Sequence, residues 1–202
     1  MVEITGPKTF RMDGESSTCV IDQCVLYIDG YEIPFEPCLG HIGGSFWLSS
    51  VAMCLFIFMN KHMFARKTVL ELGAGLALPS QYLSRLGITE HIVASDVRLD
   101  RLPCWGGIEC RLINWRSLDA NDHDKFDIVL AADCVYGNTV DALLDALCKY
   151  LRLDSMVIVI NPIRDNIEKV GYKLSELFDG LTIQRKTLYV NSLYIELLMF
   201  SN

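Results

Sequence analysis

The chain has 202 residues, of which 51% are hydrophobic and 21% are charged, and its formal net charge is −7. This length and composition predict one substantial hydrophobic core, because no long linker, repeat or low-complexity tract divides the sequence. An acidic chain without clustered Lys and Arg disfavours nucleic acid as a partner and favours lysine-rich or otherwise basic substrates.

Residues 1–40 predict a small N-terminal extension, built around a β-hairpin, that caps a larger domain over residues 41–202. Polar residues interrupted by Gly and Pro predict a loose or edge segment at 1–17. Short apolar runs predict strands over 18–21, 24–28 and 31–35. Asp29-Gly30, between the last two runs, is typical of a two-residue hairpin turn.

Residues 42–59 carry no charged side chain, and this length reaches the lower limit for a helix that crosses a membrane. The run contains two glycines and three serines, however, so a buried helix that covers a sheet is favoured. We expect this helix to extend to about Met63, and we expect no membrane association.

The cysteines and the N-terminus predict an intracellular protein. Eight cysteines occur without a CxxC pair or metal-ligand spacing, and most lie in apolar runs, as small buried side chains do in a reducing compartment. Residues 1–14 lack the apolar segment of a signal peptide. We therefore expect a cytoplasmic location, with the nucleus as a second possibility, and no bound metal.

The segment 68–80, TVLELGAGLALPS, predicts a buried strand, a tight turn of small residues and the start of a helix. Pro79 suits the first helical turn. Gly73 and Gly75 have no side chain, so a ligand can approach the backbone of this turn closely. A ligand related to a nucleotide is the first hypothesis.

The acidic residues near this turn restrict the ligand. Dinucleotide sites need a third small residue where this chain has Leu78, and Glu71 before the turn would repel a pyrophosphate. Asp96 ends a second apolar strand, 91–95, where it can accept hydrogen bonds from ribose hydroxyls. An adenosine that carries an amino acid would suit both carboxylates. The alternative is that Glu71 and Asp96 only satisfy nearby backbone amides.

The ELGAG turn followed by an acidic strand end resembles the S-adenosylmethionine (AdoMet) site of the seven-β-strand methyltransferases. The resemblance implies a Rossmann-like α/β fold. Its seven-stranded, mostly parallel sheet would have the order 3-2-1-4-5-7-6, an antiparallel seventh strand and helices on both faces. It implies AdoMet as the cofactor, held by Glu71, Gly73, Ala74, Gly75 and Asp96. An ordinary βαβ unit with a small-residue turn is the alternative.

Two tryptophans extend the resemblance. Gly44-Ser45-Phe46-Trp47 is similar to a segment of the methyltransferase family 16 protein-lysine methyltransferases, whose Trp packs beside the cofactor, although Ser49-Ser50 replaces the usual pair of alanines. Trp115 lies where the family keeps a Trp near the adenine edge. Core packing is the alternative for both side chains.

The connection after Asp96 is shorter than in the family. Only residues 97–107 precede the third expected strand, 108–115, and Pro103 with Gly106-Gly107 leaves little room for a helix. We expect a rudimentary helix here, or none.

The fourth expected strand, 126–136, is apolar on both faces, which predicts a central position in a parallel sheet. It delivers Asp133 and Tyr136 at its carboxyl end, where open α/β sheets bind ligands. Asp-x-x-Tyr resembles the signature of the same protein-methyltransferase family, and Ala132 would touch the cofactor through its backbone. The alternatives are an N-cap role for Asp133 and a core position for Tyr136.

The remaining sequence predicts two helices and three strands that complete the α/β fold. We expect a helix from the N-cap Thr139 to about Leu151, and later a helix capped by Asp165 or Asn166 that stops at Gly180. Expected strands cover 156–160, 181–190 and 193–200, the last two joined through Asn191-Ser192.

The resemblance implies an AdoMet-dependent protein N-methyltransferase, most simply one that acts on a lysine of a protein substrate. Asp133 and Tyr136 would meet the substrate amine and orient its lone pair, since methyl transfer needs alignment and no metal. Methylation of a protein arginine or histidine, or of a small amine, is the second hypothesis. The third is a non-catalytic AdoMet-fold module that binds a partner.

Overall fold

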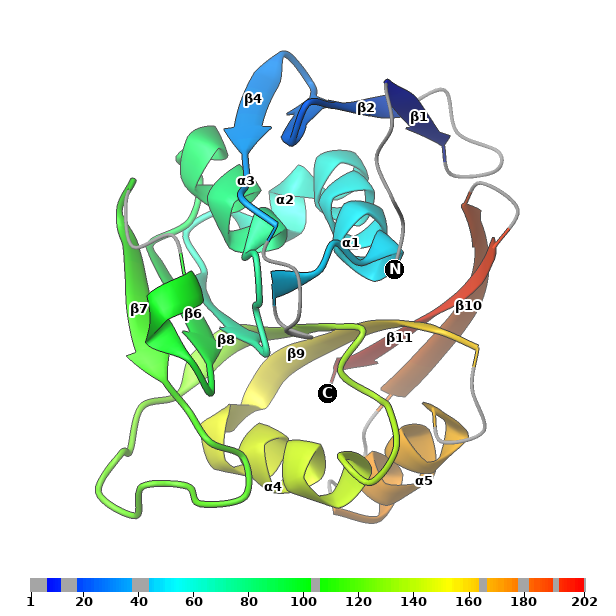
Figure 1. Ribbon diagram of the computed structural model, residues 1–202. Coiled ribbons are helices and arrows are strands. Elements are labelled where there is room, and N and C mark those ends of the chain that lie inside the picture. Colours follow the sequence, from blue (N-terminus) through cyan, green and yellow to red (C-terminus); the bar gives the residue numbers. More distant parts are fainter. Residues whose placement is uncertain are drawn as a thin grey trace.

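The computed structural model describes residues 7–11, 18–37, 44–102, 106–163, 167–177, 182–190 and 193–201, and these form two β-sheets with helices between and below them (Figure 1). The predicted boundary near residue 40 lies outside the described residues. So do the predicted caps at Asp165, Asn166 and Gly180 and the turn at Asn191-Ser192.

The N-terminal residues form an antiparallel sheet of four strands, in sequence order. These strands are β1 (Lys8–Arg11), β2 (Thr18–Asp22), β3 (Val25–Ile28) and β4 (Tyr31–Pro34). Asp29 and Gly30 have φ values of 52° and 77°, which confirms the predicted hairpin turn between β3 and β4. β1 lies at the edge of the sheet, as expected for part of 1–17.

The larger sheet has seven strands in the order β10-β11-β9-β8-β5-β6-β7. They are β5 (Thr68–Leu72), β6 (His91–Asp96), β7 (Ile108–Leu112), β8 (Phe126–Ala132), β9 (Leu151–Pro162), β10 (Thr182–Val190) and β11 (Leu193–Ser201). Counted from β5 as the first strand and read from β7, the order is 3-2-1-4-5-7-6. β11 runs antiparallel to both neighbours, so the predicted fold class is confirmed.

Helices cover both faces of this sheet. α1 (Leu48–Met59), α2 (Lys61–Phe64) and α3 (Leu78–Leu86) lie between it and the N-terminal sheet, while α4 (Val140–Tyr150) and α5 (Ile167–Leu177) lie on the opposite face (Figure 1). Alternate residues of β5 separate the two cores: Val69 packs with α1 and α3, and Leu70 packs with α4. The central strands are therefore buried on both sides.

Several element boundaries differ from the predictions. The long apolar helix ends at Met59, because Asn60 turns its amide group back to the Phe56 carbonyl (2.9 Å), and α2 is a separate turn. β7 ends at Leu112 instead of residue 115, and β8 ends at Ala132 instead of residue 136, where the left-handed backbone of Asp133 ends the extended conformation. A single 3-10 turn, Leu99–Arg101, follows Asp96, as the short connection predicts. No helix among the described residues is long and apolar enough to cross a membrane.

Asp127 aligns the two central strands at their amino ends. One carboxylate oxygen accepts hydrogen bonds from the backbone N (2.7 Å) and Oγ1 (2.8 Å) of Thr68, and the other binds Arg152 Nη1 at 2.7 Å. Partial burial opposes ionisation, but these donors outweigh it and lower the pKa of Asp127. The register of β5 and β8 is thereby set, so their carboxyl ends reach the same edge of the sheet.

The described cysteines are of two kinds. Cys24, Cys54, Cys134 and Cys148 carry thiols, whereas Cys110 on β7 is disulfide-bonded, which the expectation of a reducing compartment did not include.

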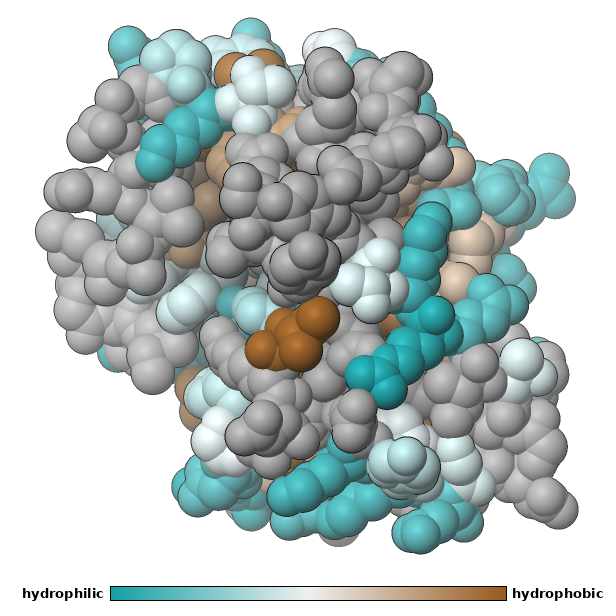
Figure 2. All heavy atoms as spheres, turned by 90° about the vertical axis from the view of Figure 1, so that its right-hand side faces the viewer, coloured by the Kyte–Doolittle hydropathy of each residue, from teal (hydrophilic) through white to brown (hydrophobic). Residues whose placement is uncertain are grey.

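Figure 2 shows a face of the protein on which most coloured side chains are hydrophilic, with a small hydrophobic spot near the centre. An exposed apolar spot of this size is ordinary on a protein surface and carries no functional argument.

Candidate active site

A cavity of about 870 Å³ lies at the edge of the large sheet where β5, β6 and β8 end. This volume is within the usual range for a small-molecule site. All predicted site residues except one line it, namely Trp47, Gly73, Ala74, Gly75, Asp96, Trp115, Ala132, Asp133 and Tyr136. The structure therefore brings together residues from widely separated parts of the chain.

The turn between β5 and α3 is fastened to the end of β6. Ala74 N donates to the Ser95 carbonyl at 2.8 Å, and Gly75 N donates to an Asp96 carboxylate oxygen at 3.0 Å. Asp96 is 9% exposed and lines the cavity. Its carboxylate thus holds the turn and also faces the cavity, where it can accept hydrogen bonds from a ligand.

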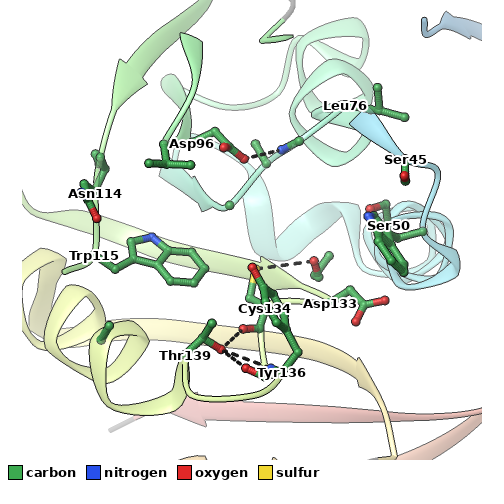
Figure 3. Close-up of a pocket in the computed structure, with 18 of the residues that line it drawn as sticks. Ser45, Ser50, Leu76, Asp96, Asn114, Trp115, Asp133, Cys134, Tyr136 and Thr139 are labelled. Carbon is green, nitrogen blue, oxygen red and sulfur yellow. Dashed lines mark hydrogen bonds between the residues drawn. The ribbon is translucent and has the colours of Figure 1, made fainter. Parts of the chain in front are cut away.

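Position 73 needs a glycine because the side chains of Trp115 and Cys134 leave no room for a Cβ. The φ of Gly73 is +63°, and a Cβ at this position would lie 2.9 Å from both Cys134 Sγ and Trp115 Cζ2. The space at Gly73 was expected to admit a ligand. Instead it lets the indole of Trp115 pack against the turn, which makes one wall of the cavity aromatic (Figure 3).

Glu71 is the predicted site residue that does not line the cavity. It is 1% exposed, and one carboxylate oxygen accepts hydrogen bonds from Ser80 N (3.0 Å) and Ser80 Oγ (2.5 Å) at the start of α3. Burial, with a smaller contribution from Asp96, raises the pKa of Glu71 to about 7 although the Ser80 hydrogen bonds oppose the rise. This placement matches the alternative role, a support for backbone amides.

The segment after β8 carries both residues expected to meet the substrate. Asp133 has a φ of 56°, uncommon outside glycine, and its N donates to the Ile160 carbonyl at 2.9 Å. Its carboxylate points toward Ser50, at the end of the cavity opposite Trp115 and Asn114 (Figure 3).

Tyr136 lies between these two ends of the cavity and is 39% exposed (Figure 3). Partial burial and the neighbouring negative charges raise the pKa of Tyr136, while Arg116 opposes the rise. The phenol therefore keeps its proton at neutral pH, and it can both donate and accept a hydrogen bond.

Sequence reasoning missed several lining residues, among them Ser45, Asn114, Arg116, Asn138 and Thr139. Arg116 Nη2 donates to Asn138 Oδ1 at 2.8 Å and joins the loop after β7 to the loop after β8. Arg116 directly follows Trp115, and Asn138 lies two residues after Tyr136, so closeness in the sequence to predicted site residues could have indicated both. Nothing in the sequence indicated that Arg116 and Asn138 pair with each other across 22 residues.

The Rossmann-like sheet places this cavity at the carboxyl ends of its central strands, where open α/β sheets bind ligands. Comparison with known proteins identifies the family, which is one of AdoMet-dependent methyltransferases. A sequence profile described as lysine methyltransferase matches residues 35–175. The chain belongs to this family.

One relative and two solved structures illustrate the similarity. Protein N-lysine methyltransferase METTL21A of Danio rerio is 28% identical over 150 residues, which cover 68% of each chain. The 1,6-didemethyltoxoflavin-N1-methyltransferase of Burkholderia thailandensis, solved with S-adenosylhomocysteine, has a TM-score of 0.56 at 16% identity over 77% of this chain and 78% of its own. A protein described as a ribosomal RNA methyltransferase from Plasmodium falciparum has a TM-score of 0.53 at 14% identity over 77% and 97%.

AdoMet is the cofactor of this class, and the cavity fits it. The carboxylate of Asp96 suits ribose hydroxyls, and the indole of Trp115 suits a purine face. The backbone of Gly73 to Gly75 would hold the amino-acid part. Trp47 also lines the cavity, and its carbonyl accepts a hydrogen bond from Ser50 N at 3.1 Å. The roles of these individual residues toward the cofactor stay predictions.

We predict that Gly73→Ala weakens AdoMet binding at least about tenfold, because the added methyl group must displace Trp115 or Cys134. Gly87→Ala is the matched control: Gly87 has nearly the same φ, +62°, but a Cβ there meets nothing within 4 Å. Both variants should lose about 1 kcal/mol of stability from backbone strain. Calorimetric titration with AdoMet compares them, and equal affinities for both variants would contradict the packing argument.

A second prediction uses the raised pKa of Glu71. A carboxyl whose pKa rises from 4.5 to about 7 on folding stabilises the protein below pH 4.5, and that contribution is lost as the pH rises through about 7. Glu71→Gln keeps an acceptor for Ser80 without this loss. Relative to the wild type, the variant should gain up to about 3 kcal/mol between pH 5 and pH 8.

Denaturant unfolding at several pH values, without AdoMet, measures this gain. Glu90→Gln provides the control, since Glu90 is an exposed residue before β6. A stability difference between Glu71→Gln and wild type that stays constant with pH would exclude the buried carboxyl as its source.

Proposed function

We propose that this methyltransferase transfers a methyl group to a lysine side chain of a protein. The observation that carries the proposal is the placement of Asp133 at the end of the cavity opposite Trp115, with Tyr136 between them (Figure 3). The family description, the relationship to a protein N-lysine methyltransferase and the acidic net charge support it.

AdoMet supplies an activated methyl group on a sulfonium, so the residues of the chain need only align a nucleophile and exclude water. A free lysine amine has a pKa of ~10.4 and must lose a proton before it can attack. Partial burial in the cavity favours the neutral amine, whereas the carboxylate of Asp133 favours the charged one. We therefore assign Asp133 mainly to orientation, as an acceptor of an amine hydrogen. The phenol of Tyr136 would provide a second hydrogen bond.

The direct test incubates the purified chain with methyl-labelled AdoMet and a protein extract depleted of methylation, then hydrolyses the labelled protein to amino acids. Label in methyl-lysine is the expected result. Label in methyl-arginine or methyl-histidine would show that the target is a protein side chain other than lysine. Label confined to small amines would move the substrate to another class, and AdoMet binding without any transfer would favour a non-catalytic module.

Asp133→Asn separates chemistry from cofactor binding. Asn tolerates the left-handed backbone of this position and keeps the shape of the side chain, but it has no charge. We predict that turnover falls about 10- to 100-fold while the dissociation constant of AdoMet changes less than about threefold.

Initial rates of labelled methyl transfer and calorimetric titration give the two numbers. Asp141→Asn is the control, because Asp141 is an exposed carboxylate on α4 that pairs with Lys173. A parallel loss of turnover and AdoMet affinity in Asp133→Asn would make Asp133 a cofactor residue instead.

A further inference from the structure

Asn161, near the end of β9, is a buried polar residue with no role in the reaction as described so far. Its side chain is 0% exposed, and it is not among the residues that line the cavity. A buried side-chain amide needs hydrogen-bond partners, since a buried donor or acceptor without a partner destabilises the folded protein. Its partners therefore indicate why the amide is there.

Both ends of the Asn161 amide bind the same residue in the segment after β8. Val135 N donates to Asn161 Oδ1 at 3.0 Å, and Asn161 Nδ2 donates to the Val135 carbonyl at 3.0 Å. The second amide hydrogen is directed to the Pro162 carbonyl at 3.1 Å. The side chain thus continues the pairing of β9 with this segment after the strand β8 has ended.

Val135 lies between the two residues that face the substrate. Asp133 has a left-handed backbone, φ 56°, and so has Gly137 on the other side, φ 51°. The segment between them belongs to no helix or strand, so its path depends on hydrogen bonds to neighbouring elements. The Ile160 carbonyl accepts from the N of Asp133 at 2.9 Å, and the amide of Asn161 binds Val135. On the other side, the Thr139 hydroxyl accepts from Tyr136 N at 3.2 Å.

We propose that Asn161 is a positioning residue for methyl transfer, which holds the backbone of Val135 and thereby sets the directions of the Asp133 and Tyr136 side chains in the cavity. The inference rests on the proposed function of that same site. It differs from a general contribution to folding because Asn161 contacts the segment that carries the reactive groups. The cofactor-side turn of Gly73 to Gly75 is held by different partners, Ser95 and Asp96.

The chain contains a matched control on the same strand. Ser155 is 5% exposed, and its Oγ also joins β9 to β8, with 2.5 Å to the Phe126 carbonyl and 2.7 Å to Arg152 N. Phe126 begins β8, whereas Asp133 follows its end. Ser155→Ala therefore removes comparable buried hydrogen bonds at the end of the strand remote from the cavity.

The first measurement is amide hydrogen exchange of the full chain, which needs no substrate. Asn161→Ala should accelerate exchange of the Val135 amide at least about tenfold and leave the amides of Ala74 and Gly75 unchanged. Ser155→Ala should leave all three unchanged. Unaltered protection of Val135 in Asn161→Ala would overturn the proposal, whether or not the wild type methylates lysine.

The second measurement is the initial rate of labelled methyl transfer to the same methyl-depleted extract, together with the dissociation constant of AdoMet. Asn161→Ala should lower turnover at least about tenfold and change AdoMet affinity less than about threefold. Turnover equal to the wild type, or an equal loss of affinity, would overturn the positioning role. If the wild type itself labels no lysine, the proposed function fails, and the exchange result still decides the role of Asn161.

Asn161→Asp is the second variant, in case the alanine variant does not fold. It keeps the side-chain shape and the acceptor for Val135 N, but it cannot donate to both the Val135 and the Pro162 carbonyls, since a protonated carboxyl has one donor and an ionised one has none. The same selective loss of turnover is expected. A variant with full turnover would show that the two donated hydrogen bonds are not both needed, which would overturn the positioning role.

Discussion

The fit between the turn after β5 and the ends of its neighbouring strands is the constraint on which the site depends. The turn approaches the loop after β8 so closely that Gly73 has no room for a Cβ, and it is hydrogen-bonded to Ser95 and Asp96 at the end of β6. This fit requires the carboxyl ends of β5, β6 and β8 to lie side by side. At the amino ends of β5 and β8, the hydrogen bonds of Asp127 to Thr68 fix the register of the two strands. The same register brings the residues that follow each strand together at the cavity.

Two carboxylates close together in this region have different tasks because their surroundings differ. Glu71 is enclosed, bound to Ser80, and burial favours its neutral form. Asp96 keeps part of its surface in the cavity while it accepts the hydrogen bond of Gly75. A ligand can therefore reach Asp96, whereas Glu71 stabilises the first turn of α3. The acidic character of the motif was informative about the ligand class, but only one of the two acids faces the cavity.

Much of the fold was predictable because its signals are local. Apolar runs such as 126–132, the Asp29-Gly30 turn and the small residues at 73–75 depend on neighbours in the sequence. The turn at Gln23-Cys24 was not predictable, since both residues adopt positive φ without a glycine and only the pairing of β2 with β3 requires this. Glu71 was predicted to bind the cofactor, but its side chain turns toward Ser80 instead. The sequence could not show this, because the direction of the side chain depends on where α3 begins in space. The Arg116–Asn138 pair and the Asn161 amide depend on contacts between distant segments, for which spacing provides no signal.

The strained backbone of the site explains why buried polar groups gather behind it. Ala77 and Asp133 both have left-handed φ values, which cost of order 1 kcal/mol or more for residues with a Cβ. Such conformations persist only where surrounding interactions outweigh the strain. At Asp133 the segment is held by the Ile160 carbonyl and the Asn161 amide, which do not line the cavity, and by the hydroxyl of Thr139, which does. The backbone geometry next to Asp133 is therefore maintained by β9 and by the residue that precedes α4, so groups outside the cavity support the shape of its wall.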